Sequence, residues 1–589
     1  MRTRRVLQIL SGTGLFVLVL ILLTLIVTAL DQPIGALVVL GVTAVAVAAG
    51  RAVSKRVPGG TVIELDLDAG VVEKPATDLP DRIFSRGATV MRDITDALNR
   101  ASGDDRIVGL VVRVGNGGLT IAQAQELRHA VRGFRASGKR TVAFSESFGE
   151  SSLSIADYYL AAVFEEIHML PMGTVSIQGV SSRTPFLRGV FDRVGIEPDF
   201  GHRREYKAMK YLLTENHYVP PHQEATEAIL GDYFDQVIDG IAEDRDIERS
   251  ALRETIDRAP LFGEEAVESG LIDRITHRDE AYETAKGDGK GFMFLDQYLK
   301  RAGRPHRRGS RIALVYGTGS ITRGSSGFDP MTRGSAFGAD DVAQAFREAR
   351  DDKKVKAIVF RVDSPGGSAM GSEVVHREVL RARESGKPVV VSMGSVAGSG
   401  GYYVSAPADR IVAQPATVTG SIGVVFGKLA TGEAWRRIGI NWGELSIGQN
   451  AGFNSPMKIY SDSERQRLEA GLDVIYEGFK ERVADGRSLS LDRVEEVAKG
   501  RVWTGAEAKE LGLVDELGGL DRAIELAREL AELEEDAPLS VQVYPKKGLI
   551  PMGTSKPSSE PVKDVLAVLS ALTTSAAPLE LRMPDTTGR

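Results

Sequence analysis

The sequence contains no cysteine, and this absence excludes several kinds of chemistry at once. Disulfide bonds, thiolate nucleophiles and cysteine-ligated zinc all need the missing side chain. The eight histidines are scattered along the chain, without the His-Glu-x-x-His pattern or another metal-ligand spacing. We therefore expect no metal site and no cofactor site, and a zinc hydrolase is disfavoured.

An excess of positive charge is also missing, because the formal net charge is −7 at pH 7. Proteins that bind nucleic acids usually carry a basic field over at least one face. We therefore expect no nucleic-acid partner. The length of 589 residues exceeds what one hydrophobic core normally organises, so the chain should hold two or more domains.

The chain repeats itself at a nearly constant distance, which indicates a tandem duplication. The distance is 244 positions over most of the repeat and 248 positions upstream, so one loop changes length by four residues. The pattern is carried by Tyr158-Tyr159 and Tyr402-Tyr403, by Gly195-Ile196 and Gly439-Ile440, and by Ser137-Gly138-Lys139 and Ser385-Gly386-Lys387.

Strand-like and helix-like patterns alternate within each copy. The apolar runs Ile107–Val114 and Val355–Val362 are typical of buried strands, whereas Ile121–Ala136 and Gly371–Glu384 follow them with a helical period. Such alternation predicts α/β units. We place an N-terminal repeat at residues 61–290, a C-terminal repeat at 310–545 and a tail at 546–589.

Two apolar runs, residues 7–30 and 33–50, precede the repeats. Each is long enough for a bilayer core of about 30 Å, and a two-residue turn separates them. We therefore predict a transmembrane helical hairpin within residues 1–60, rather than a cleaved signal peptide. The expected location is the cell membrane. Basic residues at both ends of the pair favour a cytoplasmic body, but a second run that only lies at the surface would reverse this.

Three glycine-containing loops of the C-terminal repeat could carry chemistry: residues 364–367, 397–402 and 419–423. Glycines after a strand allow backbone N–H groups to approach a ligand closely. A serine on such a turn exposes its hydroxyl, and neighbouring N–H groups can stabilise an oxyanion. Each loop taken alone is equally compatible with a simple tight turn.

A serine nucleophile needs a base, and the two copies differ in what they offer. We expect His376, in a helical stretch with charged neighbours, to lie on a solvated face. A buried lysine can act instead, because desolvation lowers its pKa. At the 244 offset, Lys207 stands opposite Ala451, and Ser399-Gly400-Gly401 stands opposite Ile155-Ala156-Asp157. One copy thus keeps a candidate nucleophile and the other a candidate base.

Six segments of the chain together form a recognisable pattern: Arg361–Ser368, Val389–Met393, Gly398–Tyr402, Thr419–Gly423, Trp503–Gly505 and Tyr206-Lys207. With them, the chain resembles the duplicated, membrane-anchored form of signal peptide peptidase A over about residues 60–545. The resemblance implies tandem crotonase-like/ClpP-like repeats and a Ser/Lys dyad without histidine, with Ser399 as nucleophile and Lys207 as general base. It also implies a homo-oligomer, specifically a tetramer.

The resemblance further implies supporting residues for the dyad, while the surroundings of the lysine depart from the family pattern. Arg204 replaces a glycine, and no Pro-Phe pair follows the lysine, which leaves Lys210 as an alternative base. The oxyanion-hole and supporting positions implied are Gly366, Gly367, Gly400 and Ser421.

The leading expectation is a membrane-bound serine endopeptidase that degrades cleaved signal peptides and other short apolar peptides, with the lipid bilayer as a further partner. Two alternatives stay open. A crotonase-like acyl-CoA enzyme would share the fold and the oxyanion loops, but it would not need a serine and a lysine divided between copies. A non-catalytic membrane scaffold would need neither.

Overall fold

The computed structural model describes residues 56–75, 87–149, 155–329, 334–546 and 580–582. The chain divides into two compact units, one of residues 60–299 with 303–589 and the other of residues 1–59 with 300–302. The apolar runs at 7–30 and 33–50 lie outside the described residues. In the part of the chain that is described, no helix combines the length and the apolar character needed to cross a bilayer.

The N-terminal half alternates strands and helices, as its sequence predicts. Its strands are β1 (Thr61–Asp66), β2 (Val71–Val72), β3 (Thr89–Val90), β4 (Ile107–Arg113), β5 (Arg140–Ser145), β6 (Glu166–Met169), β7 (Thr174–Val175), β8 (Glu197–His202), β9 (Leu261–Phe262), β10 (Arg274–Ile275) and β11 (Gly291–Phe294). Its helices are α4 (Met91–Ser102), α5 (Ile121–Arg135), α6 (Ile155–Ala161), α7 (Arg188–Val194), α8 (Met209–Thr214), α9 (Pro220–Arg245), α10 (Arg249–Asp257), α11 (Gly263–Glu268), α12 (Arg278–Lys286) and α13 (Leu295–Ala302).

The C-terminal half follows the same alternation. Its strands are β12 (Ser310–Thr318), β13 (Ile321–Thr322), β14 (Gly327–Asp329), β15 (Gly334–Gly338), β16 (Val355–Ser364), β17 (Gly366–Ser368), β18 (Val389–Gly398), β19 (Arg410–Ala413), β20 (Val418–Gly420), β21 (Val425–Ala430), β22 (Val502–Thr504), β23 (Glu516–Leu517), β24 (Leu539–Tyr544) and β25 (Glu580–Arg582). Its helices are α14 (Ala339–Asp351), α15 (Ala369–Glu384), α16 (Gly400–Ser405), α17 (Gly432–Arg437), α18 (Asp462–Arg487), α19 (Leu491–Val497), α20 (Gly505–Glu510) and α21 (Leu520–Leu530).

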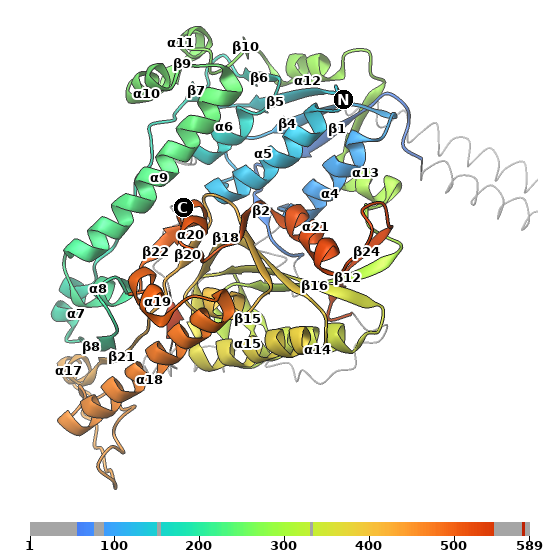
Figure 1. Cartoon of the computed structure of the whole chain (residues 1–589). Helices are drawn as coiled ribbons and strands as arrows, with labels where there is room; N and C mark the ends of the chain where they lie inside the picture. Colours follow the sequence, from blue (N-terminus) through green and yellow to red (C-terminus); the bar gives the residue numbers. More distant parts are fainter. Residues whose placement is uncertain (1–55, 76–86, 150–154, 330–333, 547–579, 583–589) are drawn as a thin grey trace, which may run out of the picture. The chain divides into compact units, whose positions relative to one another are not determined.

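Each half builds its own largely parallel sheet. The first has the order β10-β6-β5-β4-β1-β11, and the second has the order β22-β20-β18-β16-β12-β24, with β19 beside β18. The central strands β4 and β16 are almost wholly apolar and buried, as expected where helices cover both faces of a parallel sheet. Figure 1 shows α4, α5 and α21 between the two sheets. The sequence-based expectation of α/β units is confirmed.

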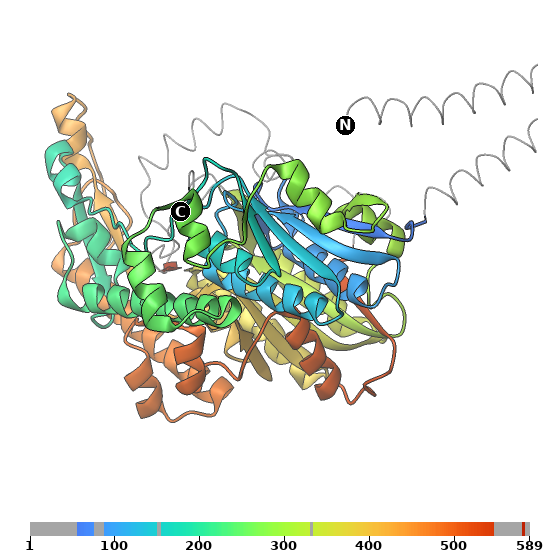
Figure 2. The same ribbon diagram turned by 90° about the horizontal axis from the view of Figure 1, so that it is seen from above.

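A third sheet contains strands from both halves and positions the loop that follows β8. Its order is β14-β15-β13-β17-β25-β21-β8, and β8 is the strand that comes from the N-terminal half. β8 pairs antiparallel with β21 over six residue pairs, from Val425 opposite His202 to Ala430 opposite Glu197. The loop that follows β8 is therefore carried onto the C-terminal half, where Figures 1 and 2 show α7, α8, α17 and α18 gathered in one projecting arm.

A buried ion cluster ties the halves together nearer the centre. The guanidinium of Arg361, on β16, lies 2.9 Å from Glu73 and 2.7 Å from Glu126, and all three side chains are buried. Glu126 also accepts a hydrogen bond from the backbone N–H of Leu520 at 2.8 Å. Because both carboxylates belong to the N-terminal half, the charge of Arg361 is neutralised only when the halves are packed together.

Replacing Arg361 by Met should strongly destabilise the protein, because it leaves two carboxylates buried without their counter-charge. We expect the free energy of unfolding to fall by about 3–5 kcal/mol, measured by denaturant titration. Arg377→Met is the matched control, since Arg377 pairs with Glu384 on the exposed face of α15. Its effect should stay within about 1 kcal/mol. Equal effects of the two substitutions would contradict a structural role for the cluster.

Candidate active site

Ser399 lies at the junction where β18 ends and α16 begins. Its backbone has φ 53° and ψ −116°, a conformation that is unusual for a residue with a side chain. The Ser399 N–H donates to the carbonyl oxygen of Gly420 at 2.8 Å, which holds the strained turn in place. The side chain is fully buried. The turn thus fixes the direction of the hydroxyl instead of leaving it mobile on the surface.

Lys207 reaches this hydroxyl from the other half of the chain. It lies in the loop between β8 and α8, and its Nζ is 2.8 Å from Ser399 Oγ. The same nitrogen lies 2.9 Å from the carbonyl oxygen of Ser421 and 3.0 Å from Ser421 Oγ. The lysine is 1% exposed. The structure therefore brings together Lys207, Ser399 and Ser421, three of the residues singled out in the sequence.

The environment of Lys207 favours the neutral amine. Burial lowers the pKa of Lys207 to about 7, because removing an ammonium from water disfavours its charged form. Its three hydrogen bonds all go to uncharged serine oxygens, so no carboxylate among them restores the charge. These surroundings hold the pKa of Lys207 well below the ordinary value of a lysine.

A segment far along the chain holds the lysine loop in position. The backbone N–H of Tyr206 donates to the carbonyl oxygen of Lys499 at 3.1 Å. At Gly500, which has φ 78°, an added Cβ would lie 2.6 Å from the Lys207 backbone nitrogen. At Gly423, an added Cβ would lie 3.2 Å from Lys207 Cδ. Because neither glycine has a side chain, the space beside each is free for the backbone and the methylene groups of Lys207.

The departure from the family pattern at Arg204 is accommodated without moving the lysine. Arg204 has φ 65°, the left-handed conformation that glycine adopts most readily. Its side chain forms an ion pair with Glu495 at 2.7 Å and lies over the ring of Tyr476. Lys210, the alternative base, is only partly buried and has no hydrogen bond to Ser399 in the described part of the chain. The geometry favours Lys207.

The glycine loops pack closely around the serine. A Cβ added to Gly400 would lie 3.2 Å from both Gly366 Cα and Gly367 N, so β17 runs directly beside the start of α16. The Gly366 N–H donates to Ser364 Oγ at 3.2 Å. Residues 580–582, which form β25, pair antiparallel with β17, with Leu581 opposite Gly367. The edge of β17 next to Ser399 thus accepts an extended segment.

The N-terminal half differs from the C-terminal half at the position of Gly401. Asp157 occupies the position of Gly401 and accepts hydrogen bonds from the backbone N–H groups of Gly118 and Leu119. At the 248 offset, these two donors correspond to Gly366 and Gly367 of the other half. Asp157 is buried, and burial raises its pKa to about 6. The second half has Gly401 at this position, and a Cβ added there would lie 2.5 Å from the carbonyl oxygen of Ser364. A side chain as large as that of Asp157 therefore does not fit in the second half.

The expectation that His376 lies on a solvated face is wrong. His376 is 6% exposed, and its ring packs against Tyr403 of α16 at 5.4 Å between centroids. Burial lowers its pKa to about 4, and its Nδ1 has no hydrogen-bond partner among the described residues. The charged residues next to His376 in sequence lie on other faces of α15, while tertiary packing covers the face that carries His376. His376 therefore packs behind the nucleophile helix and does not act as a base for Ser399.

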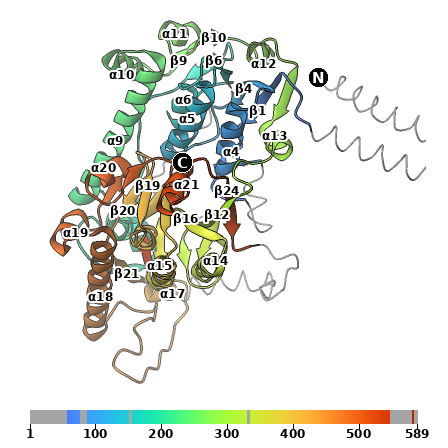
Figure 3. The ribbon, with the colours of Figure 1, turned by 45° about the vertical axis from the view of Figure 1, so that its right-hand side comes forward.

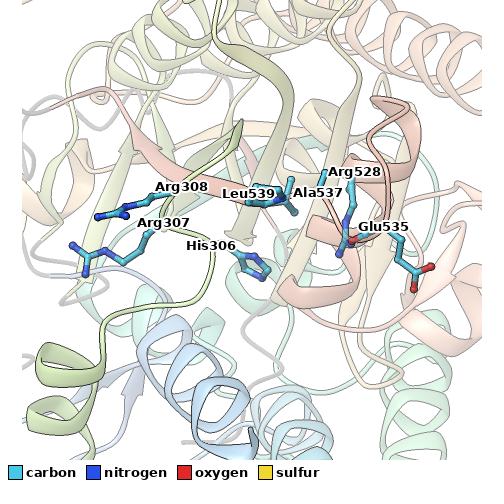
Figure 4. A pocket seen from close by; sticks show the side chains of 8 residues that line it. His306, Arg307, Arg308, Arg528, Glu535, Ala537 and Leu539 are labelled. Atoms are coloured by element: carbon cyan, nitrogen blue, oxygen red, sulfur yellow. The ribbon is translucent and has the colours of Figure 1, made fainter. Parts of the chain in front are cut away.

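A solvent-open pocket of about 220 Å³ lies at a different place, where the segment between the halves meets β24. Figure 4 shows His306 and Arg528 at its centre. It shares no residue with the Ser399 site. Its lining consists of His306, Arg307, Arg308, Arg528, Glu535, Ala537, Pro538 and Leu539.

Comparison with known proteins places this geometry in a family. Peptidase family S49 matches the chain twice, at residues 134–290 and 381–534. Protease 4 of Salmonella typhi is 32% identical over 502 residues, covering 80% of this chain and 78% of that protein. The chloroplastic serine protease SPPA of Arabidopsis thaliana is 31% identical over 491 residues, covering 81% and 70%.

A solved structure of a ClpP1 mutant from Listeria monocytogenes covers 36% of this chain and 94% of its own, with 14% identity and a TM-score of 0.23. A TM-score this low does not establish a common fold, so the crotonase-like/ClpP-like assignment stays a prediction. The twofold family match agrees with the tandem repeat, and the relatives align with most of this chain. The chain therefore belongs to peptidase family S49 and is a serine-type peptidase.

Proposed function

We propose that this protein is a membrane-bound serine endopeptidase that uses Ser399 as nucleophile and Lys207 as general base. The observation that carries the proposal is the 2.8 Å contact between the buried Lys207 amine and the Ser399 hydroxyl. An amine with a pKa of about 7 can remove the proton that a serine must lose to attack a carbonyl. In domain terms, residues 61–290 supply the base and residues 310–545 supply the nucleophile.

The reaction starts with the neutral amine. Lys207 Nζ takes the proton from Ser399 Oγ as this oxygen attacks the peptide carbonyl. The backbone N–H groups of Gly366, Gly367 and Gly400 stabilise the negative oxygen that develops. The carboxylate of Asp157 at the corresponding place in the first repeat supports this role, since it accepts from the equivalent donors.

The same lysine completes the cycle. After the first proton transfer, the ammonium of Lys207 gives its proton to the departing amine, and the peptide bond breaks to leave an acyl group on Ser399. A water molecule then gives a proton to Lys207 and attacks the acyl carbon. The ammonium of Lys207 returns this proton to Ser399 Oγ as the bond between the acyl carbon and Oγ breaks, which releases the acid and regenerates the serine and the neutral amine. Hydrogen bonds from Lys207 to Ser421 O and Oγ keep the amine directed at the reacting atoms throughout.

The substrate class follows from the edge that flanks the serine. β25 pairs with β17 as an antiparallel strand, and an extended peptide could use the same backbone groups. Short apolar peptides, including cleaved signal peptides, are the proposed substrates. The apolar runs at 7–30 and 33–50 would hold the protein in the cell membrane, close to peptides released there. A homo-oligomer, specifically a tetramer, completes the proposal.

Removing either reactive side chain should abolish cleavage. We expect Ser399→Ala and Lys207→Ala each to lower kcat/KM for an apolar peptide by about 10⁶-fold, the loss measured for a serine nucleophile or its base in another serine peptidase. Lys210→Ala is the control and should keep its activity. A serine-reactive fluorophosphonate should label the parent protein but not Ser399→Ala. An active Lys207→Ala enzyme would refute the assigned base.

The pH dependence should follow the titration of Lys207. Below pH 7 the amine is protonated and cannot accept the serine proton, so kcat/KM should rise with pH and level off above about pH 8. The measurement is kcat/KM of the full-length enzyme from pH 5 to about pH 11, above the ordinary lysine pKa, fitted to one ionisation. A midpoint near the ordinary lysine value would show that the amine is not desolvated in the working enzyme.

Filling the space beside the lysine stem should impair the enzyme without touching the reactive groups. Gly500→Ala places a methyl group against the Lys207 backbone, and we expect a loss of about 100-fold in kcat from misplacement of the amine. Gly471→Ala is the matched control, because an added Cβ there meets nothing within 4 Å. Comparable rates for the two variants would show that Gly500 does not position Lys207.

A further inference from the structure

Arg501 lies over two aromatic rings where the two halves of the chain meet. Its guanidinium carbon is 5.0 Å from the centre of the Tyr206 ring and 4.6 Å from the centre of the Trp503 ring. A cation within about 6 Å of a ring centre is attracted to the face of the ring. Arg501 and Trp503 belong to the C-terminal half, whereas Tyr206 belongs to the loop that follows β8. The arginine therefore contacts both halves.

A carboxylate of the N-terminal half holds the same two side chains. Glu224, on α9, accepts a hydrogen bond from Arg501 at 2.6 Å with one oxygen and a hydrogen bond from the Tyr206 hydroxyl at 2.7 Å with the other. Figures 1 and 3 show α9 passing beside β20 and α20, and its apolar side packs against β20 and β22. Because Glu224 is exposed, the ion pair should add little to the free energy of unfolding.

Each ring adjoins one of the two reactive residues. Tyr206 directly precedes Lys207 in the sequence. Trp503 packs on Gly420, where an added Cβ would lie 2.9 Å from Trp503 Cδ1. The carbonyl oxygen of Gly420 accepts the hydrogen bond from the Ser399 N–H that holds the strained turn. One ring is thus attached to the loop of the lysine, and the other contacts the residue that holds the turn of the serine.

The backbone of Arg501 contacts a third residue of the site. Its carbonyl oxygen accepts a hydrogen bond from the N–H of Ser421 at 2.7 Å. Ser421 in turn accepts two hydrogen bonds from Lys207 Nζ, through its carbonyl oxygen and its Oγ. A displacement of Arg501 would therefore reach the amine through Ser421 as well as through Tyr206.

The tandem repeat indicates that this arrangement serves the site and not the fold. Residues 263–273 and 505–515 align at an offset of 242, so β9 and α11 correspond to β22 and α20. At this offset Ala259 stands at the position of Arg501, and Leu261 at the position of Trp503. The first half thus builds the same strand and helix without the arginine and without the tryptophan. Both occur in the half that carries the serine.

We propose that Arg501 is a positioning residue that aligns the Lys207 amine with the Ser399 hydroxyl. It does so by linking the two rings, while Glu224 holds its guanidinium. A guanidinium suits this place, because it is planar and can lie over a ring while its N–H groups bind a carboxylate. Among the described residues, Arg501 has no hydrogen bond to either reactive group, so it acts through its neighbours. The inference rests on the proposed dyad and adds the side chains that align it.

The test compares Arg501→Gln and Glu224→Gln with a matched control elsewhere in the chain. Arg278 forms an ion pair with Glu64 at 3.2 Å and lies over the ring of Tyr282 at 4.8 Å, and the Tyr282 hydroxyl is bonded to the same carboxylate. Figure 1 shows α12, which carries Arg278 and Tyr282, well apart from β20 and β22. Arg278→Gln therefore removes the same kinds of interaction away from the site.

We expect Arg501→Gln to lower kcat of the full-length enzyme for an apolar peptide by about 10- to 100-fold, because a misaligned base slows the chemical step. KM should stay within about twofold of the parent value, since the loss falls on the transition state. The midpoint of the pH profile of kcat/KM should rise by about one pH unit, because a loosened loop admits water to the amine and its pKa returns toward the ordinary lysine value.

Glu224→Gln should change both quantities in the same direction but less, and combining it with Arg501→Gln should add little, because the two residues act through one contact. Arg278→Gln should leave kcat and the midpoint as they are in the parent enzyme. Thermal unfolding of every variant is recorded alongside the kinetics, and we expect no large change.

Values of kcat and of the midpoint that are the same for Arg501→Gln and Arg278→Gln would overturn the proposal. An equal loss at every pH, with an unchanged midpoint and a lower unfolding temperature, would overturn it too, since it would reflect a smaller folded fraction. A parent enzyme without a midpoint near pH 7 would instead refute the dyad, and the positioning role with it.

Discussion

The antiparallel pairing of β8 with β21 is the contact on which the site depends. Lys207 follows β8 after a short loop, and Ser399 belongs to the other half of the chain. The two side chains are 192 residues apart in sequence, and the strand pairing holds the segments that carry them close enough for their 2.8 Å contact. Two paired strands can shift past each other only by whole residues. The backbone hydrogen bonds between β8 and β21 therefore restrict the position of the buried amine more than side-chain packing alone.

Two features of the site cost free energy. The lysine is buried and forms no ion pair with a carboxylate among the described residues, and Ser399 and Ser421 both have positive φ values. Each arrangement costs free energy, of the order of 1–3 kcal/mol for a strained backbone. The surrounding packing must offset these costs, and the buried cluster of Arg361 with Glu73 and Glu126 holds the same two halves together. Strained residues of this kind cluster at the functional sites of proteins in general.

Much of the fold could be predicted from the sequence, because its strands and helices correspond to local patterns of apolar residues. The apolar runs at 107–114 and 355–362 are found as β4 and β16, and the helical periods at 121–136 and 371–384 as α5 and α15. The comparison of the copies also singled out Lys207 and Ser399, which lie in contact, although their catalytic roles stay predictions. The environment of His376 was mispredicted, because its burial comes from α16, which lies more than twenty residues further along the chain.

Other features of the site have no local signal. Gly500 reads as an ordinary turn glycine, and its φ of 78° is one reason for a glycine there. The second reason, its contact with a backbone 293 residues away, has no signal in the sequence around it. Asp157 reads as a polar substitution in a degenerate copy, yet its carboxylate meets the two N–H groups that match Gly366 and Gly367. The second repeat has Gly401 at that position and therefore has no such carboxylate. The two repeats thus differ in the residues that they bring to the site: the first carries the buried amine of Lys207, and the second carries the Ser399 hydroxyl that this amine contacts.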